Sequence, residues 1–384
     1  MGRRTVAHIV TQFNIGGGER QLVERLRRHP AGFTPVVVCN RAAGGFLEPI
    51  RALGIEPIVV PFRGLLHPSA ALSVARLAAV FRFLHIDVAN TNDYGNAVLS
   101  VAAARLTGTK VIVNRMDLGH LRPGFTVWHR RLEAFASRHA DLVCANAEAV
   151  RQVCISEEGC RPDRVVVLRN GLDLEHFDAL AAQPGEPLPR EPGDTVVAVV
   201  GNLWPVKDHR TLVEAAALLK DRFPRLRFFC AGDGVERPYL ESRIRELGLE
   251  GRVVLLGHRT DIPSLLARSD ALLLCSTAEG LSNAVIEGMA ARLPVVATSV
   301  GGNSELLDFK RGLLVPPRDP ASLAAAVARV MSDPDEAREM GRRARAYVEA
   351  ELTLSRMQQA HEELFLKALG EAPAANADRT RAAA

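Results

Sequence analysis

Short apolar runs rich in β-branched residues alternate with longer amphipathic segments along most of the chain. In the first half, runs of this kind predict strands at residues 5–12, 35–39, 57–61, 87–91, 110–114, 141–145 and 164–168. Between several of them, apolar positions recur at helical spacing, as at 19–28, 70–84 and 94–106. Strand–helix alternation of this kind predicts a parallel sheet with helices on both faces.

The alternation stops at residues 179–194, which contain four Pro and two Gly and have no apolar period. It then resumes, with predicted strands at 195–200, 226–230, 252–256, 271–275 and 294–298 and predicted helices at 210–222, 239–247, 282–291 and 320–331. We therefore expect an α/β protein with two Rossmann-like, doubly wound domains facing each other across a cleft. The expected boundaries are an N-terminal domain at 1–177, a linker at 178–194, a C-terminal domain at 195–351, a helix at 352–369 that packs back on the N-terminal domain, and a flexible tail at 370–384.

The composition agrees with two folded domains, since 47% of the 384 residues are hydrophobic. A net charge of +4 is too small for a dedicated nucleic-acid binder. The charge is uneven, however: residues 1–177 carry +7 and the remainder −3. Arg supplies most of the positive charge, and its planar guanidinium suits the recognition of phosphate or carboxylate.

The six cysteines include no Cys-x-x-Cys pair, which argues against a zinc site or a disulfide framework. The N-terminus leads directly into a predicted strand, and no apolar run is long enough to span a membrane. We expect a cytoplasmic protein with reduced thiols.

Ligands of open parallel sheets bind beyond the carboxyl ends of the strands, so the loops at these ends are the candidate binding and catalytic sites. Gly16, Gly17 and Gly18 follow the first strand and open a helix, where backbone N–H groups favour an anion. The dinucleotide fingerprint is incomplete, because Gln21 stands where a third Gly is required. A tight turn with a helix cap is the alternative interpretation of this loop.

The most informative segment is 271–305. A buried strand ends at Ser276, Glu279 lies in the following loop, and Glu287 lies more than a turn inside a helix that starts near Ser282. The free N–H groups of the helix start are suited to a diphosphate, and a carboxylate further back is suited to vicinal ribose hydroxyls. Taken alone, Glu287 could equally be a solvated carboxylate on a helix face.

Residues 279–306 (EGLSNAVIEGMAARLPVVATSVGGNSEL) resemble the donor site of the retaining family 4 glycosyltransferases, whose two glutamates separated by seven residues match Glu279 and Glu287. The loop at 16–19 resembles the family's Gly-Gly-x-Glu loop, 170–173 with Phe177 resembles its domain junction, and 201–207 resembles the first loop of its donor domain. The resemblance implies the glycosyltransferase B (GT-B) fold, with the donor in the C-terminal domain and the acceptor in the N-terminal one.

The resemblance also implies a role for individual residues. Glu287 would bind the ribose hydroxyls of a nucleotide sugar. The catalytic residues would be Glu279, which would lie by the transferred sugar or its flanking backbone, and Lys207, which would neutralise the departing diphosphate. A solvated loop lysine is the alternative for Lys207. The remaining donor-binding residues implied by the family are Gly16, Gly17, Gly280, Leu281, Ser282 and Asn283.

Two positions depart from the family pattern. Asn202 stands where an Arg is usual, so we expect Arg259 or the helix N-terminus to supply the missing positive charge. The usual His after the fifth N-terminal strand is replaced by a loop resembling an Arg-Asp-Leu-Gly variant, and we expect Arg115 and Asp117 to be catalytic residues near the reaction centre. His120, in the same loop, would either reach inward or cap the loop.

No Asp-x-Asp follows a strand, which predicts a metal-independent reaction without a cofactor. The expected substrates are a UDP- or GDP-sugar and a glycan or polyprenyl-diphosphate-linked acceptor; no nucleic-acid partner is expected. Residues 119–139 interleave Phe125, Trp128 and Phe135 with several arginines, which suits an anionic membrane surface or a polyprenyl pocket. An ordinary amphipathic helix is an equally good interpretation of this segment.

We therefore predict a retaining hexosyltransferase of bacterial exopolysaccharide, lipopolysaccharide or related glycoconjugate synthesis, cytoplasmic or peripheral on the inner face of the cell membrane. Two alternatives remain open: a nucleotide-sugar epimerase on the same fold, and a non-catalytic protein that binds glycans or nucleotide sugars. Release of nucleotide only in the presence of an acceptor would exclude both.

Overall fold

A computed structural model describes residues 3–14, 16–119 and 126–372. Its N-terminal strands are β1 (Arg4–Val10), β2 (Phe33–Cys39), β3 (Ile58–Val59), β4 (Val88–Thr91), β5 (Lys110–Arg115), β6 (Leu142–Ala145) and β7 (Val165–Val167). Its C-terminal strands are β8 (Thr195–Val200), β9 (Leu226–Ala231), β10 (Val253–Gly257), β11 (Ala271–Leu274), β12 (Val295–Thr298) and β13 (Leu313–Val315).

The N-terminal helices are α1 (Gly17–Arg27), α2 (Leu47–Arg51), α3 (Ala70–Phe83), α4 (Tyr94–Thr107), α5 (Val127–His139), α6 (Glu148–Ser156) and α7 (Leu174–Ala181), with a short 3-10 turn η1 (Pro162–Arg164). The C-terminal helices are α8 (His209–Leu219), α9 (Arg237–Glu246), α10 (Ile262–Ala267), α11 (Asn283–Ala290), α12 (Asn303–Leu307), α13 (Pro320–Ser332), α14 (Pro334–Glu351) and α15 (Leu354–Leu369), with a 3-10 turn η2 (Pro205–Lys207).

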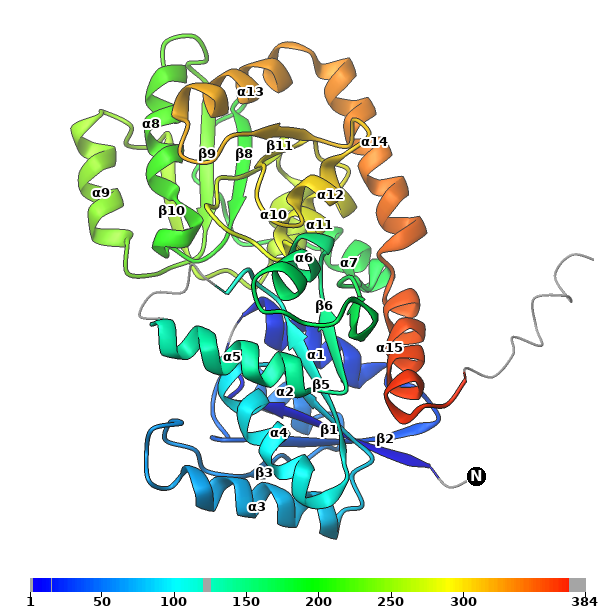
Figure 1. The fold of residues 1–384 in the computed structure, drawn as a ribbon. Helices are drawn as coiled ribbons and strands as arrows, with labels where there is room; N and C mark the ends of the chain where they lie inside the picture. Colours follow the sequence, from blue (N-terminus) through cyan, green and yellow to red (C-terminus); the bar gives the residue numbers. More distant parts are fainter. Residues whose placement is uncertain (1–2, 15, 120–125, 373–384) are drawn as a thin grey trace, which may run out of the picture.

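The strands form two parallel sheets in separate halves of the molecule (Figure 1). One has seven strands in the order β3-β2-β1-β4-β5-β6-β7, and the other has six in the order β10-β9-β8-β11-β12-β13. The strand order reverses between β1 and β4 and again between β8 and β11, which is where parallel sheets open a crevice for ligands. The predicted fold class is confirmed.

Two local features differ from the sequence prediction. The strand β13 was not predicted, because its three apolar residues stand between Gly312 and a Pro-Pro pair and are too few to show a period. It nevertheless extends the sheet by pairing with β12. Helix α7 ends at Ala181 and so occupies the first residues of the segment expected to be a linker.

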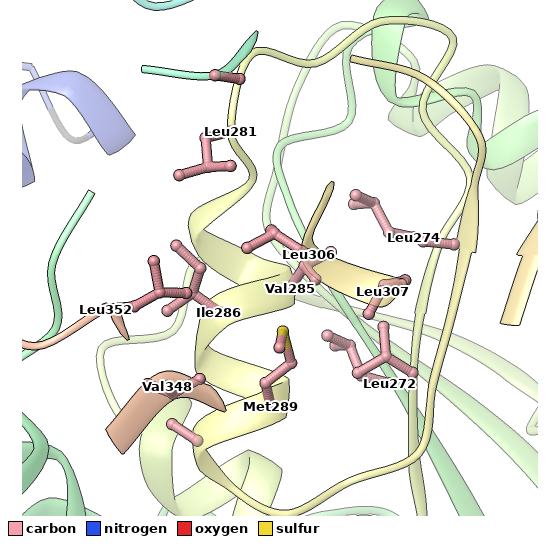
Figure 2. Packing of buried hydrophobic residues seen from close by; sticks show 14 of the residues in the cluster. Leu272, Leu274, Leu281, Val285, Ile286, Met289, Leu306, Leu307, Val348 and Leu352 are labelled. Atoms are coloured by element: carbon pink, nitrogen blue, oxygen red, sulfur yellow. The ribbon is translucent and has the colours of Figure 1, made fainter. Parts of the chain in front are cut away.

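A shared hydrophobic core joins the two domains around α11 (Figure 2). Val285, Ile286 and Met289 of α11 pack with Leu272 of β11 and with Val348 of α14 in one buried cluster. The same cluster includes side chains of β6 and α6 from the N-terminal domain. Because each such side chain contributes about 1.5–3 kcal/mol when fully buried, this core fixes where α11 lies between the sheets.

The last helix crosses back to the first domain. Helix α14 lies against the C-terminal half, whereas α15 lies beside the N-terminal sheet (Figure 1). Leu364 and Phe365 of α15 are buried in a cluster with Val88 of β4 and Ile112 of β5. Residues at the chain's C-terminus are therefore part of the N-terminal domain's core.

Candidate active site

A cleft of about 360 Å³ lies between the carboxyl ends of the two sheets. The N-terminal wall is made by the loop before α1 and by the loops after β5 and β6. The C-terminal wall is made by the loops after β8, β10 and β11 and by the start of α11. The cleft brings together all of the residues that the sequence predicted for donor binding, namely Gly16, Gly17, Asn202, Lys207, Arg259, Glu279, Gly280, Leu281, Ser282, Asn283 and Glu287.

The two walls touch at Gly280. A Cβ atom built there would lie 2.0 Å from the carbonyl oxygen of Met116, on the opposite wall. No side chain fits into that space, so only Gly allows the loop after β11 to approach the loop after β5 this closely. This contact closes one end of the cleft and fixes the position of the adjoining Glu279.

Lys207 and Glu279 form an ion pair within the C-terminal wall. The Nζ atom of Lys207 donates to Oε1 of Glu279 at 2.6 Å, and the same oxygen accepts the hydroxyl of Ser276 at 2.6 Å. The two side chains are 23% and 11% exposed, so both remain accessible from the cleft while largely withdrawn from bulk water. The pair holds a positive ammonium group in a site of reduced dielectric, where its effect on a phosphate is strengthened.

Glu287 extends from α11 toward the opposite domain. Its side chain is 7% exposed, and Oε1 accepts a hydrogen bond from Nη1 of Arg20, on α1. Burial raises the pKa of the Glu287 carboxyl, and the Arg20 guanidinium partly offsets this effect. Glu287, the second of the two glutamates separated by seven residues, is thus a buried carboxylate paired with Arg20, which lies 267 positions away in the sequence. It is not a solvated residue on a helix face.

The start of α11 is held by both domains. The hydroxyl of Ser282 caps the helix by accepting the N–H of Val285 at 3.4 Å. The Asn283 side chain donates to the carbonyl of Gly17 at 3.2 Å and accepts from Asn170 at 2.8 Å. These contacts place the N-terminus of α11 opposite the N-terminus of α1, so the positive ends of two helix dipoles face one cleft.

Asn202 and Arg259 both line the cleft, but the guanidinium of Arg259 is already paired with a carboxylate. Its guanidinium donates to both carboxylate oxygens of Asp261, at 2.8 and 2.6 Å, and its side chain is 3% exposed. A further bond goes to the carbonyl of Glu186 at 3.1 Å. The charge of Arg259 is thus balanced by Asp261, and a role for Arg259 at the diphosphate stays a prediction.

Arg115 has turned away from the cleft. Its side chain is 2% exposed and forms ion pairs with Glu158 and, at 3.6 Å, with Glu133. Burial alone would lower the pKa of the guanidinium, and the two carboxylates more than offset this, so that its pKa is raised. Both carboxylates pair with this guanidinium outside the donor cleft, and Arg115 lines the same small cavity as Asp117, so a catalytic role for Arg115 stays a prediction.

Asp117 belongs to a separate, smaller cavity. This cavity, of about 40 Å³, lies at the carboxyl ends of β4 and β5 and is also lined by Asn92 and Tyr94. Asp117 accepts the N–H of Gly119 at 2.8 Å, which shapes the loop. A role for Asp117 on the acceptor side stays a prediction, and His120 lies outside the described residues.

Helix α5 exposes apolar side chains beside arginines. Trp128 is 68% exposed and Phe135 40%, and the guanidinium of Arg131 lies 5.2 Å from the Trp128 ring centroid. Phe125 and Arg122 lie outside the described residues. Among the helices that the structure describes, none combines the length and apolarity needed to cross a membrane.

No group of three or more His, Cys, Asp or Glu side chains in the described part of the chain is arranged to hold a metal ion. The metal-independent reaction stays a prediction. The cysteines, which sequence analysis expected to be reduced, are unpaired and buried in the described structure.

The structure adds residues that the sequence did not identify as donor-site candidates, above all Arg20 and Asn170. Both stand within motifs that the sequence did single out, since Arg20 follows the Gly-rich loop and Asn170 opens the segment at the domain junction. Their contacts with α11 join segments far apart in sequence, which no local pattern reveals.

Comparisons with known proteins agree with this geometry. Residues 15–176 match the family model described as Glycosyltransferase Family 4, and residues 186–347 match the model described as Glycosyl transferases group 1. The chain is 30% identical over 260 residues to UDP-Gal:alpha-D-GlcNAc-diphosphoundecaprenol alpha-1,3-galactosyltransferase of Escherichia coli, covering 64% of this chain and 67% of that one. It is 28% identical over 305 residues to the putative glycosyltransferase EpsD of Bacillus subtilis, covering 76% and 79%.

Among solved structures, HepE of Anabaena in complex with UDP superimposes with a TM-score of 0.81 at 23% identity, covering 94% of this chain and 100% of that one. The same protein in complex with UDP-glucose gives a TM-score of 0.80, also at 23% identity, covering 94% and 99%. At this level of identity, the likeness concerns the fold.

Proposed function

Because the chain belongs to glycosyltransferase family 4 and has the GT-B fold, we propose that it transfers a hexose from a UDP-sugar to a lipid-linked saccharide, with retention of the anomeric configuration. The observation that carries the proposal is the convergence of Lys207, Glu279 and Glu287 on one cleft at the switch points of both sheets. A UDP donor is favoured by the UDP and UDP-glucose complexes of HepE and by the UDP-Gal donor in the name of the E. coli relative.

In the proposed complex, the ribose hydroxyls donate to the Glu287 carboxylate, and the diphosphate lies between the N-terminus of α11 and Lys207. The bond between the sugar C1 and the diphosphate oxygen breaks, and the acceptor hydroxyl oxygen bonds to C1 on the same face. The hydroxyl proton goes to the departing phosphate oxygen. Lys207 and the α11 N-terminus stabilise the charge that develops on UDP, without a metal ion or a cofactor.

Glu279 has two functions in this proposal. Through its ion pair it holds the Lys207 ammonium at the site where phosphate charge develops. Glu279 also lines the cleft, where its other carboxylate oxygen would accept hydrogen bonds from hydroxyls of the transferred sugar. A fixed ammonium group costs no reorganisation at the moment of reaction, and that is the advantage of a preorganised site.

The acceptor would enter from the N-terminal side and reside in the inner leaflet of a bacterial cell membrane, as an intermediate of exopolysaccharide, lipopolysaccharide or related glycoconjugate synthesis. The E. coli relative is named for a diphosphoundecaprenol-linked acceptor. In this chain, α5 presents Trp128 and Phe135 beside Arg130, Arg131 and Arg138, a combination suited to an anionic interface.

Two measurements test the proposal. Thermal unfolding with UDP-glucose, UDP-galactose, UDP-GlcNAc and GDP-mannose should show stabilisation by a UDP-sugar, by about 2.7 kcal/mol at a concentration a hundredfold above its Kd. Release of UDP should then require an undecaprenyl-diphosphate-linked sugar, should persist in EDTA, and should give an α-linked product by NMR. Nucleotide release without an acceptor, or a β-linked product from an α-linked donor, would contradict it.

A further inference from the structure

Of the Lys and Arg side chains that line the cleft from the C-terminal wall, Lys207 is the accessible one, and its ammonium group is already paired with Glu279. Lys207 is accessible from the cleft, whereas Asn202 is neutral and Arg259 is neutralised by Asp261. The diphosphate of a nucleotide carries more negative charge than one ammonium group balances. The α11 N-terminus supplies only a partial charge, so a second full positive charge would come from another part of the cleft.

Arg20 is suited to this requirement. It lies in the first turn of α1, directly after the glycine loop that lines the cleft, and its side chain is 42% exposed. Its ion pair with Glu287 crosses from one domain to the other. This pair compensates the buried carboxylate that the proposed function assigns to the ribose.

The ribose and Arg20 compete for the same acceptor. When two ribose hydroxyls donate to Glu287, one of them would take the place of Arg20 Nη1 on Oε1, and the guanidinium would be released into the cleft. The planar fork of Arg binds phosphate oxygens in a bidentate manner, and the exposed side chain has the freedom to reorient. The diphosphate, attached to that same ribose, is then the nearest anion.

We propose that Arg20 is a diphosphate-binding residue of the N-terminal domain, which exchanges Glu287 for the diphosphate when the nucleotide binds. This inference rests on the proposed function, since it requires a nucleotide with its ribose on Glu287. It gives the cleft a cation from each wall, Lys207 on one side and Arg20 on the other. It also makes the nucleotide a bridge that holds the two domains together.

The test is the affinity for UDP and for uridine of the wild-type chain, Arg20→Gln and Arg20→Lys, by calorimetry for UDP and by competition for uridine. Arg20→Gln should weaken UDP binding tenfold or more, as expected for a lost charge-assisted bond, while uridine binding stays unchanged or tightens. Arg20→Lys should recover part of the UDP affinity. A purely structural partner of Glu287 predicts the opposite sign, because its removal frees the carboxylate for the ribose.

Arg28→Gln is the matched control. Arg28 directly follows α1, about 12 Å from Arg20 along the helix axis. Its side chain is 44% exposed, pairs with the carboxylate of Asp173 and does not line the cleft. This substitution should change UDP affinity less than twofold and leave the melting temperature close to that of the wild type, and all affinities are measured at a temperature where each variant is fully folded. If Arg20→Gln lowers UDP affinity by less than twofold, or lowers uridine affinity as much as UDP affinity, the inference about Arg20 is overturned and the proposed function stands. A wild-type chain that binds no uridine nucleotide would overturn the proposed function with it.

Discussion

The two walls of the cleft differ in whether their charged side chains remain exposed to the cleft. On the C-terminal wall, Lys207 and Glu279 pair with each other and still line the cleft. On the N-terminal wall, Arg115 also stands at the end of a strand, yet two carboxylates hold it inside the domain. A charge at a strand's carboxyl end is therefore a candidate ligand group only if its partners leave it exposed to the cavity.

The largest expected effect tests the interior role of Arg115. Arg115→Ala leaves Glu133 and Glu158 without their shared buried cation, and we expect a loss of about 3–5 kcal/mol in the free energy of unfolding. Urea denaturation measures it, with Arg161→Ala as the control, because Arg161 is 67% exposed and pairs with an exposed carboxylate. A stable Arg115→Ala protein that lacks only activity would reverse our assignment and place Arg115 in the reaction.

The next effect concerns the opposite wall. Lys207→Ala should lower kcat by about 10²–10³, since its charge is needed most as UDP departs, while the melting temperature changes little. Lys220→Ala is a suitable control, because this lysine of the same domain only contacts the carbonyl of Leu247, away from the cleft. Activity within a factor of two of the wild type would show that the phosphate site is elsewhere.

A smaller effect is expected from the buried carboxylate of α11. Glu287→Gln keeps the shape but loses the charge, and we expect UDP affinity to fall by about 1.5–3 kcal/mol, roughly 10- to 150-fold. Calorimetry on a variant with a native melting temperature measures this loss. An unchanged affinity would mean that Glu287 serves only the ion pair with Arg20.

The two domains also differ in their buried histidines. In the N-terminal domain, the buried Arg25 lies beside three of them. Arg25 contacts His361 at 3.4 Å, and His8 contacts His29 at 3.0 Å. Burial lowers the pKa of His29 to about 4 and of His361 to about 3, and that of His8 well below its usual range. In the C-terminal domain, burial lowers the pKa of His209 to about 4.

Because these pKa values are depressed, the four histidines stay neutral in the folded state, whereas in the unfolded state they take up protons below about pH 6.5. Stability is therefore complete above pH 6.5 and falls as the pH drops toward 4, by up to about 1.4 kcal/mol per histidine for each pH unit. With three such groups against one, the N-terminal domain should loosen first in hydrogen exchange between pH 7 and pH 5. His361→Gln should reduce this slope, and earlier exchange in the C-terminal domain would contradict the comparison.

The smallest effect concerns the surface charge difference between the domains. Arg131→Gln should weaken co-sedimentation with anionic vesicles about fivefold at low salt, since each Arg near such a surface contributes about 1 kcal/mol. Arg342→Gln, an exposed α14 arginine paired with Glu339, should change nothing. If the wild type does not bind anionic vesicles even at low salt, a soluble acceptor is favoured. If binding persists at high salt, Trp128 inserts into the membrane.

Sequence predicted the C-terminal wall far better than the N-terminal one, and the reason is physical. Glu279 and Glu287 lie within one strand–loop–helix unit, so their placement follows from local periodicity and helix geometry. Arg115 depends instead on Glu158, 43 positions away, and Arg20 on Glu287, 267 positions away. Such pairings are set by the packing of whole domains, and a single sequence carries no pattern for them.

The return of α15 to the first sheet sets an order for folding during synthesis. Val88 and Ile112 leave the ribosome early, but their partners Leu364 and Phe365 leave after the entire C-terminal domain. Until then, the part of the N-terminal sheet that α15 covers remains exposed, and the contact that covers it is among the most distant in the chain. A nascent chain that terminates before residue 354 would keep an apolar sheet face exposed, the kind of surface that promotes aggregation and chaperone binding.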